Sequence, residues 1–227
     1  MNSNVYCFIS FPLSLLYTCS RRHKSVHHIS GARRAGICIY AKINPNNDNW
    51  LNDFLVKSND EDRATFANQL KWTFRNSKTD VRKSAWNSWI INYWIDRDAG
   101  RPIKFSDREK VTMIEMALLL ENQMNEVVDF VISSPSPKLN TATKLFSDLE
   151  KDGYATNHPK EILNLLLHLL PNIHQDFYIC FALEPVAESL IDRLSLDSTN
   201  RNKLIQLCEH LARYQCPKAI EFRSKFP

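Results

Sequence analysis

Apolar residues recur at helical spacing along the chain after residue 47. Trp50, Leu51, Phe54 and Leu55 share one face of a short helix, and later segments repeat this spacing. No alternation of apolar and polar residues is long enough to predict a strand. We therefore expect a series of helices at about residues 50–55, 59–75, 79–98, 106–122, 125–132, 141–152, 159–170, 174–183, 185–194 and 198–214, with a terminal turn from Pro217.

The starts and ends of several helices carry residues with known positional preferences. Ser58 with Glu61, and Ser106 with Glu109, match the capping box in which a hydroxyl side chain begins a helix. Gly100 follows the Trp-rich segment and predicts a left-handed residue at the end of that helix. These signals set the boundaries of the predicted helices.

The predicted fold class is all-α. Helices this short are marginally stable alone, so they must bury their apolar stripes against each other as antiparallel hairpins. Helix pairs recur every 30 to 45 residues without matching letters, which predicts an irregular, HEAT-like array. We expect residues 48–227 to form this helical domain.

Residues 1–47 differ from the rest of the chain and lack a helical period. Residues 1–40 hold five basic residues and no acidic one. Because the whole chain has a net charge of +4, the remaining 187 residues have a net charge of −1. The apolar run from Val5 to Leu16 is shorter than the roughly 20 residues of a membrane-spanning helix. A signal peptide is disfavoured because Arg21 and Arg22 follow this run, although the composition is also similar to an organelle transit peptide. We interpret this segment as an unstructured or mis-assigned extension and expect no membrane association.

Motifs for catalysis, cofactors and metals are missing from the sequence. The chain has only four glycines, and neither dinucleotide-binding nor phosphate-binding glycine loops can be formed from them. No GxSxG motif and no paired CxxC ligands occur. We expect Cys180, Cys208 and Cys216 to be buried free thiols in a cytoplasmic protein. His168, among leucines, is predicted to be a hydrogen-bonded core residue, and no enzyme activity, cofactor or metal is expected.

The most specific feature is an aromatic and basic cluster near the middle of the chain. One interpretation is a stacking platform that binds a nucleobase or a single strand, and the other is a core helix, which we favour because aromatic residues usually occupy cores. The residues of this candidate binding site are Trp86, Trp89, Tyr93, Trp94, Arg97 and Arg101. At helical spacing Trp94 lies at the edge of one face, which is formed by Trp86, Trp89, Ile90, Tyr93 and Arg97.

Nucleic-acid binding through this cluster remains an alternative function. It would use the five basic residues Arg97, Arg101, Lys104, Arg108 and Lys110. Four acidic residues lie between them, so the local charge is mostly cancelled. Because phosphate binding depends on uncompensated positive charge, we do not favour this alternative.

The segment from Trp86 to Pro102, followed by Ser106, Glu109, Met113 and Met116, resembles a helical domain of unknown function. That domain occurs at the C-terminal end of bacterial sirtuin-like proteins, and the leucine-rich helix that begins at Pro159 is similar to another part of it. The resemblance covers about residues 80–195. It implies a protein of phage defence whose sirtuin-like domain is absent here, as if the gene were truncated, so no enzymatic residue can be transferred. We expect a non-catalytic interaction or scaffold module that binds a protein partner or a second copy of itself.

Overall fold

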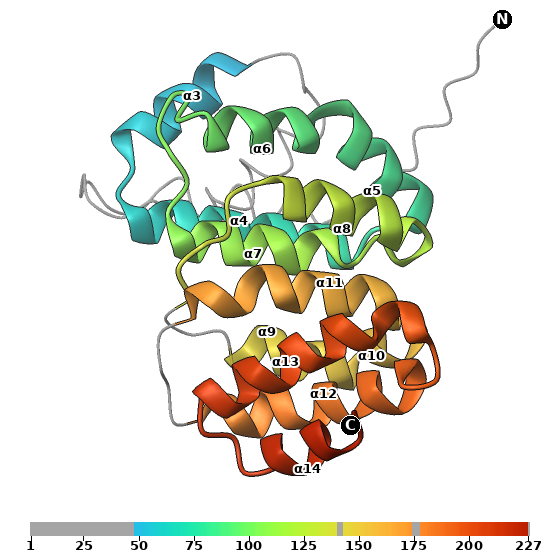
Figure 1. Ribbon diagram of the computed structural model, residues 1–227. Coiled ribbons are helices and arrows are strands. Elements are labelled where there is room, and N and C mark those ends of the chain that lie inside the picture. Colours follow the sequence, from blue (N-terminus) through green and yellow to red (C-terminus); the bar gives the residue numbers. More distant parts are fainter. Residues whose placement is uncertain (1–47, 140–142, 174–177, 227) are drawn as a thin grey trace, which may run out of the picture.

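The computed structural model describes residues 48–139, 143–173 and 178–226, and its regular elements there are helices (Figure 1). The only β-type pairing among these residues is an isolated parallel bridge between Leu139 and Ile173. The all-α prediction is confirmed. The predictions made for residues 1–47 lie outside the described residues.

The helices form two halves, one above the other in Figure 1. The first half contains α3 (Asp48–Lys57), α4 (Asp60–Arg75), α5 (Thr79–Ala85), a π-helical turn η1 (Trp86–Ile90), α6 (Ile91–Asp98), α7 (Asp107–Ala117), η2 (Glu121–Gln123) and α8 (Met124–Ser133). The second half contains α9 (Thr143–Lys151), α10 (Tyr154–Asn157), α11 (Pro159–Leu169), η3 (Leu170–Asn172), α12 (Ile179–Leu194), η4 (Ser198–Asn200), α13 (Arg201–Arg213) and α14 (Ala219–Ser224).

Helices far apart in the sequence pack together, which makes the array irregular. In the first half α4 packs on α7, and in the second half α12 packs on α9, α11 and α13. Helix α11 also packs on α8 and therefore joins the two halves. Its leucine-rich sequence suits this central place, because five apolar side chains of α11 are fully buried. These are Ile162, Leu163, Leu165, Leu166 and Leu169.

Several boundaries differ from the predicted ones: α7, for example, ends at Ala117 and not near residue 122, and α10 is not among the predicted helices. Two of the differences have a clear physical reason. The two helices expected on either side of residue 184 are one helix, α12, with Pro185 inside it. Pro185 is exposed, so the carbonyl that loses its backbone partner can bind water instead. At the start of α4 the cap is Asn59, which accepts from the Asp62 amide at 2.9 Å, while the Ser58 hydroxyl donates to the Phe54 carbonyl. The predicted capping box at Ser58 is therefore wrong.

Two other predicted boundaries are confirmed. Ser106 caps α7 and accepts a hydrogen bond from the Glu109 amide at 3.3 Å. Gly100 has a φ of +77° and ends α6, with the amide of Arg101 donating to the Asp96 carbonyl at 2.8 Å. These contacts form a Schellman motif, which requires the left-handed conformation that glycine adopts without strain.

Candidate binding site

The π-helical turn determines which aromatic residues of the cluster face the core. A π turn holds one more residue than an α-helical turn and rotates the following residues by about 100° relative to the preceding ones. Trp94 is therefore at the centre of the buried face and fully buried, whereas Trp89 is at its edge and partly buried. The prediction for these two residues, Trp89 on the buried face and Trp94 at its edge, is wrong because it holds only for a regular α-helix.

A buried ion pair joins α6 to α7. Arg97 and Glu109 are both fully buried, and the Arg97 guanidinium forms a charge-assisted contact with the Glu109 carboxylate. The Tyr93 hydroxyl donates to the same carboxylate at 2.7 Å. Arg97 also donates to the carbonyl of Ile103, which fixes the connection between the two helices. Burial and the nearby Glu109 carboxylate hold the pKa of Tyr93 well above its ordinary value, so Tyr93 remains a donor.

A second polar group lies beside this ion pair, where α6, α7 and α8 meet. The Asp98 carboxylate accepts from the Lys110 ammonium at 2.6 Å and from the Trp94 indole at 3.0 Å. The Ser134 hydroxyl also donates to Asp98 and accepts from the Trp94 indole at 3.0 Å. Burial lowers the pKa of Lys110, and the contact with Asp98 partly offsets this effect.

Phe105 covers the polar groups from the connection between α6 and α7. Its ring makes edge contacts with Tyr93 and Trp94, at centroid distances of 6.0 and 5.9 Å. The Arg97 guanidinium lies 5.0 Å from the centroid of the Phe105 ring, in a cation–π arrangement. The Arg97 guanidinium therefore contacts side chains and a carbonyl of the protein interior.

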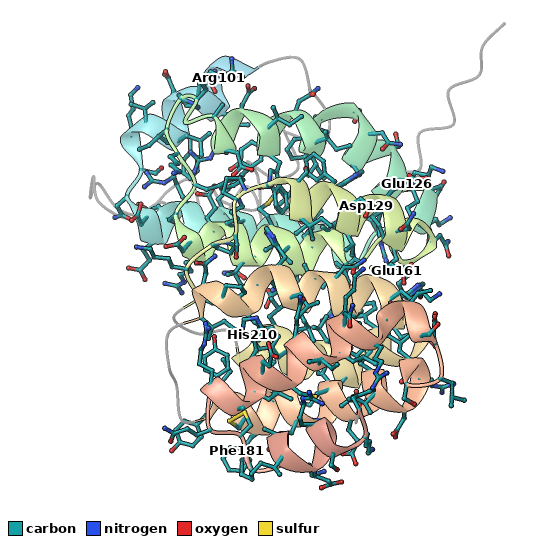
Figure 2. All side chains as sticks on the ribbon, in the orientation of Figure 1. Arg101, Glu126, Asp129, Glu161, Phe181 and His210 are labelled. Atoms are coloured by element: carbon teal, nitrogen blue, oxygen red, sulfur yellow. A yellow bond between two sulfur atoms is a disulfide. The ribbon has the colours of Figure 1, made fainter. Side chains whose placement is uncertain are left out.

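The six residues of the candidate site do not form one accessible surface. Trp86, Tyr93, Trp94 and Arg97 meet in the core, where their faces contact other side chains. Arg101 is exposed in the turn that follows α6 and pairs with Asp96 at 2.9 Å (Figure 2). This arrangement supports the core-helix interpretation: the cluster fixes the orientation of α6, α7 and α8 relative to each other. A base could stack on the four buried side chains only after local opening.

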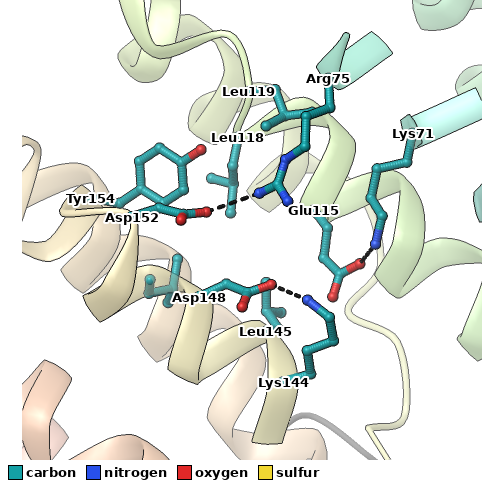
Figure 3. A pocket seen from close by; sticks show the side chains of 11 residues that line it. Lys71, Arg75, Glu115, Leu118, Leu119, Lys144, Leu145, Asp148, Asp152 and Tyr154 are labelled. Atoms are coloured by element: carbon teal, nitrogen blue, oxygen red, sulfur yellow. Dashed lines mark hydrogen bonds and ion pairs between the residues drawn. The ribbon is translucent and has the colours of Figure 1, made fainter. Parts of the chain in front are cut away.

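A shallow pocket lies where α4 and α7 meet α9 and the start of α10 (Figure 3). Four leucines form its apolar part, and its charged side chains are paired. Arg75 pairs with Asp152 at 3.1 Å across the two halves, Lys71 pairs with Glu115, and Lys144 pairs with Asp148. The sequence did not predict this site. A signal was present, because residues four apart lie on the same face of a helix: this applies to Lys71 and Arg75, and again to Asp148 and Asp152.

The chemistry of this pocket is limited. Burial, together with the charges of Glu121 and Asp152, raises the pKa of the Tyr154 hydroxyl to about 12. The phenol is therefore neutral at ordinary pH and is a poor general base. The other charged side chains of the pocket form three ion pairs. A charged ligand could bind one of them only by displacing the side chain with which it is paired. We assign no reaction to this pocket.

Two of the three cysteines predicted to be free thiols form a disulfide, so the prediction is wrong for them. Cys180, in the first turn of α12, and Cys216, after α13, form a disulfide with a Cα–Cα distance of 5.2 Å (Figure 2). Their separation of 36 residues gave no signal in the sequence. Cys208 is free and buried, as predicted, and burial raises the pKa of its thiol. His168 is half-buried and hydrogen-bonds the backbone of Ser134, which agrees with its predicted core role.

Residues 48–139, 143–173 and 178–226 contain neither a candidate metal site nor a candidate membrane-spanning helix. Among these residues, no three His, Cys, Asp or Glu side chains come together in a way that could hold a metal ion. No helix formed by the same residues has both the length and the apolar character needed to cross a membrane.

Comparison with known proteins places the chain in a family. No curated protein and no solved structure matches it. The sequence profile of a domain of unknown function, DUF4020, matches residues 37–211. The match is wider than the expected resemblance over residues 80–195, and it begins inside the segment 1–47 that we interpreted as an extension. Helix α14 lies outside the match. Since it covers more than half of the sequence, the chain belongs to the DUF4020 family.

Proposed function

We propose that this protein is a non-catalytic helical interaction module that associates with a second copy of itself. The observation that carries the proposal is the exposure of three large apolar side chains in the two segments that the disulfide links. Tyr178 is 64% exposed, Phe181 70% and Ile220 84%. Large exposed aromatic side chains that lie together are typical of protein interfaces.

These three residues, here called the apolar patch, come from two segments that the disulfide brings together. Tyr178 and Phe181 lie at the start of α12, and their ring centroids are 6.5 Å apart. Ile220 lies in α14, four residues after Cys216, which is bonded to Cys180. Figure 2 shows Phe181 close to the disulfide at the lower end of the molecule.

Charges beside the apolar patch favour a second copy as the partner. Glu184 and Glu188 on α12 lie next to Lys218, so both signs of charge occur on this side of the protein. A two-fold contact places the same surface of both copies face to face, and a surface with both signs can then pair with itself. The net charge of −1 after residue 40 also gives little repulsion between copies.

The test is the molar mass in solution, measured by light scattering after size-exclusion chromatography over a range of concentrations. We expect a dimer, and we expect Phe181→Ser to weaken the association at least tenfold. The matched control is Leu196→Ser, because Leu196 is 98% exposed and lies in the connection between α12 and α13. A monomer at every concentration, or equal effects of the two substitutions, would overturn the proposal.

We further propose that the module belongs to the helical part of a sirtuin-like bacterial defence protein and acts in the cytoplasm. Support comes from the resemblance of the Trp86–Pro102 segment and from membership of a family of domains of unknown function. The DNA upstream of the gene tests this proposal. An open frame that encodes a glycine-rich nucleotide-binding fold is expected there, and an unrelated gene with its own stop signal would contradict it.

Nucleic-acid binding is the second candidate, and the side-chain contacts give it less support. Of its five basic residues, Arg97 and Lys110 are buried in ion pairs and Arg101 is paired with Asp96. A titration with single-stranded DNA over a salt series separates the candidates. An affinity that falls steeply with salt would favour nucleic-acid binding over the interaction module.

A further inference from the structure

The last helix, α14, lies beyond the region that matches the family and packs mainly on α13. The amide of Lys218 donates to the Glu184 carboxylate at 2.8 Å, and its ammonium pairs with Glu188 at 2.8 Å. Lys225 lies 3.5 Å from Asp192. These ion pairs are exposed to a large extent, and such pairs contribute little to stability.

Three buried apolar side chains and one covalent bond supply the rest of the attachment. Ala219, Phe222 and Phe226 are buried against the second half. The disulfide between Cys180 and Cys216 fixes the residue that lies three positions before α14 to the first turn of α12. A helix of six residues is not stable alone, so α14 depends on these contacts for its structure.

We propose that Cys180 and Cys216 form a redox-operated latch that controls the docking of α14. With the disulfide formed, α14 is held near α12 and packs on α13. With both sulfurs reduced, the chain after α13 is free to separate, and the short helix opens. This inference concerns the state of α14 and does not depend on self-association of the protein.

The chemistry of the latch is a thiol–disulfide exchange with a dithiol as the reductant. A thiolate of the dithiol attacks one cysteine sulfur, the S–S bond breaks, and the other cysteine leaves as a thiolate that takes up a proton. The second thiolate of the dithiol then attacks the mixed disulfide and releases the first cysteine. The protein gains two thiols, and the dithiol leaves as its cyclic disulfide. A disulfide oxidant reverses the sequence.

Cys208 provides an internal reporter of the open state. Its thiol is buried in α13, and the charge of Arg223 in α14 acts on it, which places α14 nearby. Buried thiols react slowly with alkylating reagents, since both access and the thiolate fraction are low. Opening of α14 should therefore speed the alkylation of Cys208.

The experiment is hydrogen exchange measured by mass spectrometry on the full chain, with and without dithiothreitol. We expect the amides of residues 219–226 to exchange at least tenfold faster after reduction, while those of α4 and α7 do not change. The double substitution Cys180→Ser with Cys216→Ser should reproduce the effect without reductant and should speed alkylation of Cys208, followed by peptide mapping. Lys218→Ala, which removes the ion pair to Glu188 and keeps the disulfide, is the matched control and should leave α14 protected.

Three results would overturn the latch. Equal protection of α14 in both redox states would show that the disulfide does not control it. A uniform increase of exchange in every helix would make the disulfide a general staple of the fold. Free thiols at Cys180 and Cys216 after treatment with oxidised glutathione would show that the bond does not form.

Discussion

The two halves of the molecule are stabilised in different ways. Among the described residues, the buried charged side chains are Arg63, Arg97, Glu109 and Lys110, and all lie in the first half. The second half buries mainly leucines, keeps its ion pairs near the surface and adds a disulfide. Apolar contacts tolerate small changes of orientation, whereas a buried ion pair requires one geometry. The first half therefore fixes its helix orientations through polar partners, and the second half through packed volume and a covalent bond.

Loss of one partner of the buried ion pair should have the largest effect. Glu109→Ala leaves the Arg97 guanidinium buried without its carboxylate, so we expect a loss of about 3–5 kcal/mol in the free energy of unfolding. Urea denaturation followed by circular dichroism measures this loss. The control is Asp53→Ala, whose partner Lys57 is largely exposed, and it should change little.

The double substitution Arg97→Met with Glu109→Leu sharpens the same comparison. It removes both charges at similar volume, and replacement of a buried pair by apolar residues is often neutral or stabilising. A stability near that of the wild type would mean that the pair serves orientation more than stability. If the double variant is as unstable as Glu109→Ala, the hydrogen bonds to Tyr93 and Ile103 are the main contribution.

The π-helical turn gives a comparison within the first half. Trp94→Ala removes a fully buried side chain, so we expect a loss of about 3–5 kcal/mol in the free energy of unfolding. Trp89→Ala removes a partly buried one and should cost clearly less. The same urea titration measures both. The reverse order would mean that the helix is regular and that the turn at Trp86–Ile90 does not exist.

The sequence predicted the helices well because periodicity and capping residues are local signals. It also predicted that the Trp-rich segment faces the core. It did not predict the buried position of Trp94, because the extra residue of a π turn leaves no pattern in the spacing of apolar residues. The contacts of Glu109 with Arg97, and of Cys216 with Cys180, depend on which helices are neighbours, and short-range patterns do not contain that information.

Two histidines, one at the junction of the halves and one in the second half, predict a pH dependence of stability. Burial lowers the pKa of His168, with a further contribution from Lys110, while its hydrogen bond to the Ser134 backbone acts in the opposite direction. Burial also lowers the pKa of His210, with Arg213 adding to the effect and Glu209 opposing it. As the pH falls below about 6.5, the unfolded chain binds protons that the folded chain does not yet bind.

Stability should therefore decrease from pH 7 toward pH 5, over the interval between the unfolded and the lowered folded pKa values. Urea midpoints at several pH values measure the slope. His168→Gln, at the junction of the halves, and His210→Gln, in the second half, should each reduce the slope of stability against pH. A slope that neither substitution changes would assign the pH dependence to other groups.

The ends of α6 and α13 allow the most direct comparison of the halves, with the smallest expected effect. Both helices end in a Schellman motif: the amide of Arg101 donates to the Asp96 carbonyl at 2.8 Å, and that of Cys216 donates to the Leu211 carbonyl at 2.9 Å. The left-handed residue is Gly100 in the first half but Gln215, with a φ of 59°, in the second. A residue with a Cβ atom is strained in this conformation.

Gln215→Gly should therefore stabilise the protein by about 0.5–1 kcal/mol, because the relief of strain exceeds the greater flexibility of glycine in the unfolded chain. Gly100→Ala is the opposite change. Nothing lies within 4 Å of an added Cβ atom there, so its cost, about 1 kcal/mol, comes from backbone conformation alone. Thermal unfolding in the oxidised state measures both variants. If Gln215→Gly destabilises the protein, the Gln215 side chain contributes a contact that outweighs the strain next to Cys216, and the two helix ends are not equivalent.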